Sequence, residues 1–170
     1  VLKNPLQIKF FRTIELISYR FSNIITVHSE GNRRMLLDQY PLSEKKIHVL
    51  HNWVDLENHQ KTKTIDFRKK WNLTHQYIAV FAGVMGPSQY LELIIRIANS
   101  LHKQEDLLFL MVGGGVEKEK LMKSSSEKHL SNIRFENFIS REDYLSLLKI
   151  CNFGLVCLSP KNKTPVIPGK

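Results

Sequence analysis

The sequence predicts an α/β fold in which a parallel β-sheet carries helices on both faces. Four apolar runs suited to buried strands occur in the second half of the chain, at residues 77–82, 107–112, 133–138 and 153–158. Helical segments separate these runs, and strands that alternate with helices form parallel sheets. Two glycine-containing turns directly follow the first two runs.

The first part of the chain is expected to hold a smaller set of elements. Apolar side chains at helical spacing predict a helix over residues 5–21. A strand at 24–27, a helix capped by Ser29 and a strand at 46–50 are expected to follow. These elements are too few to bury a sheet on both faces. We therefore interpret residues 1–55 as the end of an α/β domain whose beginning precedes this sequence.

Residues 56–75 are predicted to form a linker and a connecting helix. Residues 76–170 are predicted to form a Rossmann-like domain that is truncated at its C-terminal end. A polar helix is expected to start near Glu117, and Ser140 is expected to cap the last helix. Right-handed crossovers bring the loops after the strands to one sheet edge, where ligands bind in such folds.

The two glycine turns are the leading candidates for a ligand site. Their residues are Gly83, Val84 and Gly86 in the first turn and Gly113, Gly114 and Gly115 in the second. Glycine lets backbone amides approach a phosphate closely, and a following helix adds a favourable dipole. Chain reversal alone would explain either turn, but two turns at equivalent strands favour nucleotide or phosphate binding.

Composition narrows the class of protein further. The net charge of +9 suits an anionic partner, and 42% hydrophobic residues suffice for a packed core. Cys151 and Cys157 are interpreted as reduced thiols of a cytosolic protein. His48 and His51 lie three residues apart, and positions three apart on a strand face opposite sides, so no metal site is expected.

Four segments occur in a fixed order along the chain. They are His51-Asn52-Trp53-Val54-Asp55, the turn from Gly83 to Gly86, the stretch Val112-Gly113-Gly114-Gly115, and Asn137-Phe138-Ile139 leading to Pro168-Gly169-Lys170. This order resembles the C-terminal half of the retaining glycosyltransferases of family 4, which have the two-domain GT-B fold. The similarity runs from about residue 23 to residue 170.

The resemblance implies an enzyme that moves a sugar from a nucleoside-diphosphate sugar to a glycan or lipid-linked glycan, in polysaccharide or glycolipid synthesis. It implies no metal or other cofactor and no nucleic-acid partner. The implied donor-binding residues are Gly83, Val84, Gly86, Ser88, Gly113, Gly114, Gly115, Phe138, Ile139 and Lys170. Of these, Phe138 and Ile139 correspond to the segment that contacts the base. The expected location is cytoplasmic, with peripheral contact at the inner membrane surface left open.

The chain also departs from the family pattern. Val84 stands where relatives often have a basic residue, no lysine occurs near Ser88, and Tyr90 stands where glycine is common. No acidic residue follows Asp143, so at least part of the family's glutamate pair is missing. The catalytic residues therefore stay unassigned, and we expect the chain alone to be inactive.

Two other functions remain open from the sequence. A sugar-nucleotide epimerase or phosphorylase of similar shape would turn over the donor without an acceptor, but no acid–base pair is evident. A basic, non-catalytic module that binds nucleic acid or protein would suit the charge. Against it, the sequence has no aromatic-rich RNA motif, zinc spacing or basic recognition helix.

Overall fold

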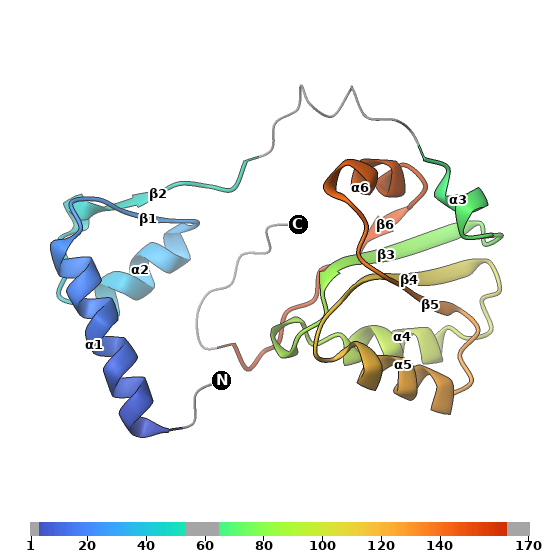
Figure 1. Ribbon diagram of the computed structural model, residues 1–170, viewed down its shortest axis with the longest axis horizontal. Helices are drawn as coiled ribbons and strands as arrows, with labels where there is room; N and C mark the ends of the chain where they lie inside the picture. The colour runs from blue at the N-terminus through green and yellow to red at the C-terminus, as the bar shows by residue number, and fades with distance from the viewer. Residues whose placement is uncertain (1–3, 54–64, 163–170) are drawn as a thin grey trace. The chain divides into compact units, whose positions relative to one another are not determined.

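A computed structural model describes residues 4–53 and 65–162, which fall into two compact units (Figure 1). The first unit comprises residues 4–53 and the second residues 65–162.

The second unit is built on a four-stranded, entirely parallel sheet with the order β5-β4-β3-β6. Its strands are β3 (Tyr77–Val84), β4 (Leu107–Gly114), β5 (Ile133–Glu136) and β6 (Phe153–Gly154). The register of β3 and β4 aligns Gly83 with Gly113. The two glycine turns therefore begin at the same level of the sheet.

The strand order creates a topological switch between β3 and β6. The chain moves outward from β3 through β4 to β5, with α4 (Glu92–Ser100) and α5 (Lys118–Glu127) as crossovers. Helix α6 (Arg141–Leu148) then returns the chain past β3 to β6. In open α/β sheets, ligands bind outside the carboxyl ends of the strands at such a switch.

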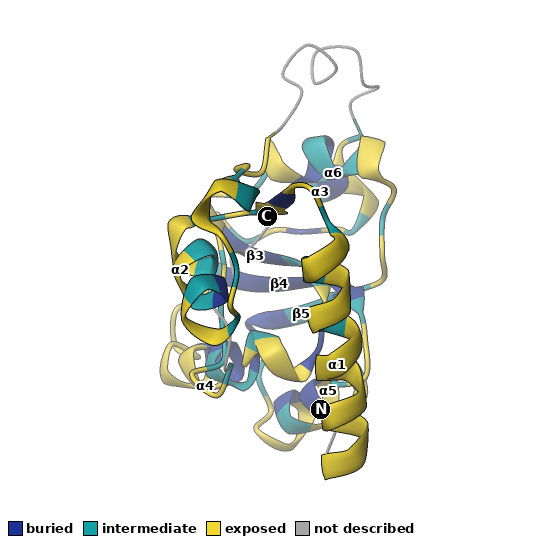
Figure 2. Cartoon of the chain, turned by 90° about the vertical axis from the view of Figure 1, so that its left-hand side faces the viewer, coloured by how far each residue is buried: buried dark blue, intermediate teal, exposed yellow. Residues whose placement is uncertain are grey.

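Helices cover both faces of this sheet, as the alternation of its side chains requires (Figure 1). Phe81 of β3 packs in one cluster with residues of α4 and α5. Its neighbour Val80 packs in the other cluster with Phe67 of α3 (Phe67–Lys70) and Leu147 of α6. Figure 2 shows β3 and β4 as mainly buried strands. The predicted α/β fold with helices on both faces is confirmed.

All four strands of the second unit differ from their predicted boundaries, and β5, expected at 133–138, ends at Glu136. β3 and β4 run two residues further than expected and include the first glycines of their turns. β6 was expected at 153–158 but pairs only through Phe153 and Gly154. It has a single neighbouring strand, and a glycine contributes no side chain to hold a longer pairing.

The first unit contains a two-stranded parallel sheet with two longer helices. Its elements are α1 (Pro5–Phe21), β1 (Ile25–Val27), α2 (Glu30–Gln39) and β2 (Ile47–Val49), with a short 3₁₀ turn at Glu44–Lys46. Ser29 caps α2 as predicted, because its hydroxyl accepts a hydrogen bond from the Asn32 amide at 3.1 Å. The core of this unit is small and centres on Ile25, Leu36 and Ile47.

Helix α1 is exposed along its length and has no buried residue (Figure 2). Glu15 ties it to the segment after α2, because its carboxylate accepts hydrogen bonds from the hydroxyls of Tyr19 on the same helix and of Tyr40, at 2.8 and 2.5 Å. The Lys46 ammonium adds a second tie by donating to the Arg20 carbonyl oxygen at 3.2 Å. The two tyrosine rings meet edge to face at 5.1 Å. Burial, followed by the hydrogen bonds to Glu15, raises the pKa of both tyrosines.

Candidate functional site

The carboxyl edge of the second unit's sheet brings most of the expected donor-binding residues together. Three of them, Gly113, Gly114 and Gly115, form the glycine triplet at the end of β4. Gly113 has φ +140°, and a Cβ added there would lie 2.0 Å from the carbonyl oxygen of Gly83. Gly115 has φ +146°, and a Cβ would lie 2.4 Å from the Met85 carbonyl oxygen. The close approach of the two turns therefore requires both glycines, whatever ligand the edge binds.

Gly86 is different, because the protein does not require glycine there. Its φ is −130°, and the nearest atom to an added Cβ is a methyl carbon of Val84 at 4.0 Å. If a larger residue at Gly86 were found to weaken ligand binding, the cause would therefore be contact with the ligand and not a steric clash within the protein.

Two backbone amides at the start of α5 are available to an anion. Gly115 and Val116 are exposed, and their amides donate to no acceptor among the described residues. The next amide, that of Glu117, donates to Met85 O at 3.1 Å and ties this turn to the one after β3. Helix N-termini of this kind favour phosphate groups.

The turn after β3 forms a short 3₁₀ helix, Pro87–Gln89, followed by Tyr90. Tyr90 has φ +51° and ψ 45°, in the left-handed region that favours glycine. The departure at Tyr90 therefore places a bulky residue in a backbone conformation that suits glycine. Val84 and Ser88 are exposed beside this turn.

Phe138 lies against the glycine triplet. Its ring is so close to Gly114 that an added Cβ would lie 3.0 Å from Phe138 Cε2, yet the side chain is 62% exposed. Ile139 instead packs against the cluster on the α6 face of the sheet. The structure therefore leaves an aromatic ring beside the triplet, whereas the Ile139 side chain belongs to the core.

Lys118 is a candidate that sequence reasoning missed. Its ammonium donates to the carbonyl oxygens of Gly113 and Glu136, both at 2.9 Å, and to the Asn137 side-chain oxygen at 2.8 Å. These contacts join the end of β4 to the end of β5. One signal was available in the sequence. A lysine at the first position of a helix interacts unfavourably with the helix dipole, so its presence there indicates another stabilising contact.

Lys170, with the rest of the Pro168-Gly169-Lys170 segment, lies outside the described residues. In the described ranges, no three His, Cys, Asp or Glu side chains come together as metal ligands would.

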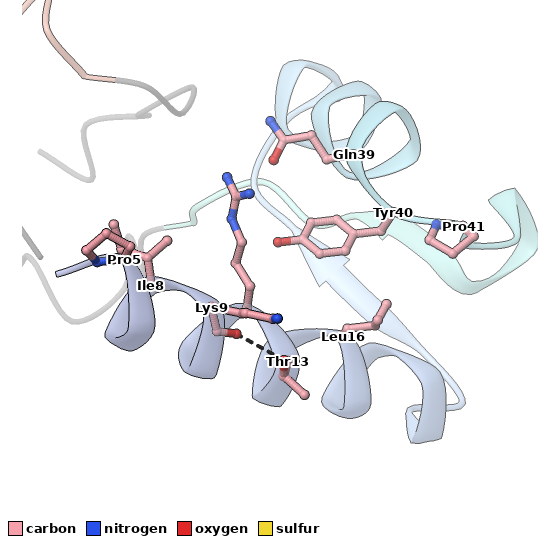
Figure 3. Close-up of a pocket in the computed structure, with 9 residues that line it drawn as sticks. Pro5, Ile8, Lys9, Thr13, Leu16, Gln39, Tyr40 and Pro41 are labelled. Atoms are coloured by element: carbon pink, nitrogen blue, oxygen red, sulfur yellow. Dashed lines mark hydrogen bonds between the residues drawn. The ribbon is translucent and has the colours of Figure 1, made fainter. Parts of the chain in front are cut away.

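The first unit has a groove of its own, of about 520 Å³, between α1 and the segment after α2 (Figure 3). Its lining residues include Ile8, Lys9, Arg12, Leu16 and Tyr40. None of the expected donor-binding residues lines this groove.

The fold and the glycine-lined edge define a Rossmann-like domain of the kind that binds nucleotides. The model of the family "Glycosyl transferases group 1" matches residues 63–161, more than half of the chain. The chain belongs to this family, which confirms the predicted membership and favours a glycosyltransferase over the epimerase and the binding module.

Individual relatives agree with this family. The chain is 29% identical over 123 residues to the putative colanic acid biosynthesis glycosyl transferase WcaI of Escherichia coli K12, covering 70% of this chain and 30% of that relative. The structure of Anabaena Alr3699/HepE in complex with UDP and glucose is similar over 84% of this chain and 40% of its own, with a TM-score of 0.69 and 14% identity. WaaG, a glycosyltransferase involved in lipopolysaccharide biosynthesis, gives a TM-score of 0.63 at 14% identity over 78% of this chain and 37% of its own. At such identities the two structures show a shared fold.

Proposed function

We propose that the second unit binds a nucleoside-diphosphate sugar at the carboxyl edge of its sheet, and that the enzyme transfers the sugar with retention of configuration. The observation that carries this proposal is the β3–β6 switch, with the glycine turn of β3 beside it and the glycine turn of β4 at the same level of the sheet. The relatives support the donor class, because the HepE structure contains UDP and glucose.

During sugar transfer the nucleoside diphosphate is the leaving group and gains negative charge, which the site has to stabilise. The exposed amides of Gly115 and Val116, at the N-terminus of α5, would supply hydrogen bonds and a favourable dipole to that charge. The ring of Phe138 would border the base, held beside the triplet by the Lys118 contacts. No metal has a role in this scheme.

We further propose a glycan or lipid-linked glycan as the acceptor, in polysaccharide or glycolipid synthesis on the cytoplasmic side of a membrane. The relatives motivate this, since WcaI is described for colanic acid biosynthesis and WaaG for lipopolysaccharide biosynthesis. The chain spans less than a third of the length of WcaI, so the acceptor belongs to the proposal for the whole enzyme.

Peripheral membrane contact is a separate part of the proposal. Among the described residues, no helix is both long and apolar enough to span a bilayer. Helix α1 does expose Phe10, Phe11 and Phe21 beside basic residues, a combination that suits an anionic lipid surface. Co-sedimentation with phosphatidylglycerol vesicles but not with phosphatidylcholine vesicles would support the contact, and equal recovery in the supernatant with both would refute it.

A thermal-shift titration with UDP, GDP, ADP and their sugar conjugates tests the donor site. A ligand at 100 times its dissociation constant stabilises the fold by about 2.7 kcal/mol, which is a readily measured shift. We expect one base to be preferred. A well-folded sample that responds to no nucleotide would contradict the proposal.

Transfer itself needs an enzyme form that includes the acceptor-side domain. We expect release of the nucleoside diphosphate to depend on an acceptor glycan, in the presence of EDTA, with the anomeric configuration of the donor sugar kept in the product. Donor isomerisation without an acceptor would contradict the transferase reaction, and inversion of configuration would contradict the retaining mechanism.

A further inference from the structure

The turn after β3 lacks the cation that a diphosphate site needs. Val84, Ser88 and Gln89 carry no charge, and the structure places two of them, Val84 and Ser88, at the surface. A positive group that reaches this turn must therefore come from another segment.

The segment after β6 reaches this turn. The carbonyl oxygen of Ser88 accepts a hydrogen bond from the Ser159 amide at 2.8 Å and from the Asn162 side-chain nitrogen at 3.2 Å. The Ser159 hydroxyl in turn accepts from the Lys161 amide at 3.2 Å. Lys161 thus lies between two residues that are both anchored to the same carbonyl group.

This position is at the topological switch. The segment follows β6, and the turn follows β3. The two hydrogen bonds to Ser88 therefore join the loops at the carboxyl ends of these two paired strands. A cation there would face a ligand bound outside the carboxyl ends of the two strands.

Three other basic groups of the second unit already have partners. Lys118 makes three hydrogen bonds to the ends of β4 and β5. Arg134 pairs with Glu136 at 2.7 Å, and Arg68 donates to backbone carbonyl oxygens. Lys161 is exposed, and its ammonium is in no ion pair or hydrogen bond with another described residue.

We infer that Lys161 supplies a positive charge to the donor diphosphate. The charge comes from the loop after β6, because the turn after β3 carries none. This inference depends on the proposed donor site, because it assigns a residue to the diphosphate of that donor.

The test compares the 170-residue chain with three variants by calorimetric titration. The variants are Lys161→Met, the double variant Lys161→Met/Ser88→Lys, and the control Lys128→Met, which removes an exposed lysine at the C-terminal end of α5. The probes are UDP, GDP and ADP, and then the nucleoside without phosphate for whichever diphosphate binds most tightly. Circular dichroism verifies that each variant is folded.

We expect Lys161→Met to weaken diphosphate binding roughly tenfold, the low end for a charge-assisted hydrogen bond because the site is exposed to water. Binding of the nucleoside without phosphate and of all probes to Lys128→Met should be unchanged. Ser88→Lys in the Lys161→Met background should restore affinity, because it returns a charge to the same place from the other loop. A purely structural role of Lys161 would not be rescued in this way.

Each other outcome is decisive. Unchanged diphosphate affinity in Lys161→Met would overturn the inference and leave the donor site standing. A loss that Ser88→Lys fails to restore would also overturn it. If the unaltered chain binds none of the three diphosphates, the proposed function fails and this inference fails with it.

Discussion

Replacing Gly113 by alanine tests whether the glycine triplet is required by the fold. The added Cβ would lie 2.0 Å from the Gly83 carbonyl oxygen and 2.9 Å from its carbonyl carbon, and the backbone would keep φ +140°. Both neighbours are backbone atoms held in the β3–β4 pairing near its carboxyl end, so neither can rotate away. A strained left-handed residue costs about 1–3 kcal/mol, and overpacking a core costs about as much again. We therefore expect the free energy of unfolding to fall by about 3 kcal/mol or more.

The assay is urea denaturation followed by Trp71 fluorescence, since Trp71 packs against Phe67 in the core of the second unit. The matched control is Gly86→Ala, where the added methyl has room and φ is −130°. That variant should lie within about 0.5 kcal/mol of the unaltered chain. If Gly113→Ala were as stable as the control, the steric explanation of the triplet would be wrong. If Gly86→Ala keeps its stability but loses nucleotide affinity, the ligand is what requires glycine at that position.

Three further predictions concern single side chains of the second unit. Lys118→Met should lower the free energy of unfolding by about 3 kcal/mol, because it leaves three acceptors unpaired. A loss below about 0.5 kcal/mol in urea titration would contradict the role of Lys118 in joining the ends of β4 and β5. His129→Gly should stabilise the chain by about 0.5–1 kcal/mol in the same assay, because His129 holds φ +50° at the end of α5; equal stability of His129→Ala and His129→Gly would refute this reason. Burial raises the pKa of the Cys151 thiol to about 11. In a Cys157→Ser background, the alkylation rate of Cys151 should therefore increase about tenfold per pH unit from pH 8 to pH 10. A plateau of this rate below pH 9 would contradict the burial of the thiol.

Much of the second unit could be predicted from the sequence, because its strands are buried and its caps are local. Ser140 illustrates this, since its hydroxyl accepts from the Asp143 amide at 3.0 Å as a helix-capping residue should. The length of β6 could not be predicted, because pairing depends on a neighbour far away in the chain. An apolar run such as 153–158 suits a strand whether or not a partner continues beside it.

The site was predictable only in part, for the same reason. The glycines were evident from their position after the strands. The sequence does not reveal that a Cβ at Gly113 would lie 2.0 Å from the Gly83 carbonyl oxygen, whereas one at Gly86 would have its nearest neighbour at 4.0 Å. Lys118 and Lys161 act across loops that the fold brings together. Their relevance rests on hydrogen bonds between residues up to 74 positions apart, which no local pattern encodes.

The most direct test of the central claim is to map nucleotide binding by NMR on the ¹⁵N-labelled chain, whose mass of 19.8 kDa is suitable. The nucleoside diphosphate with the largest thermal shift is titrated, and amide shift changes are followed residue by residue. The account predicts changes concentrated at residues 83–90, 113–118, 137–139 and 155–162, around the carboxyl ends of β3, β4, β5 and β6. Changes confined to the groove of the first unit, or to the opposite ends of the strands, would contradict it.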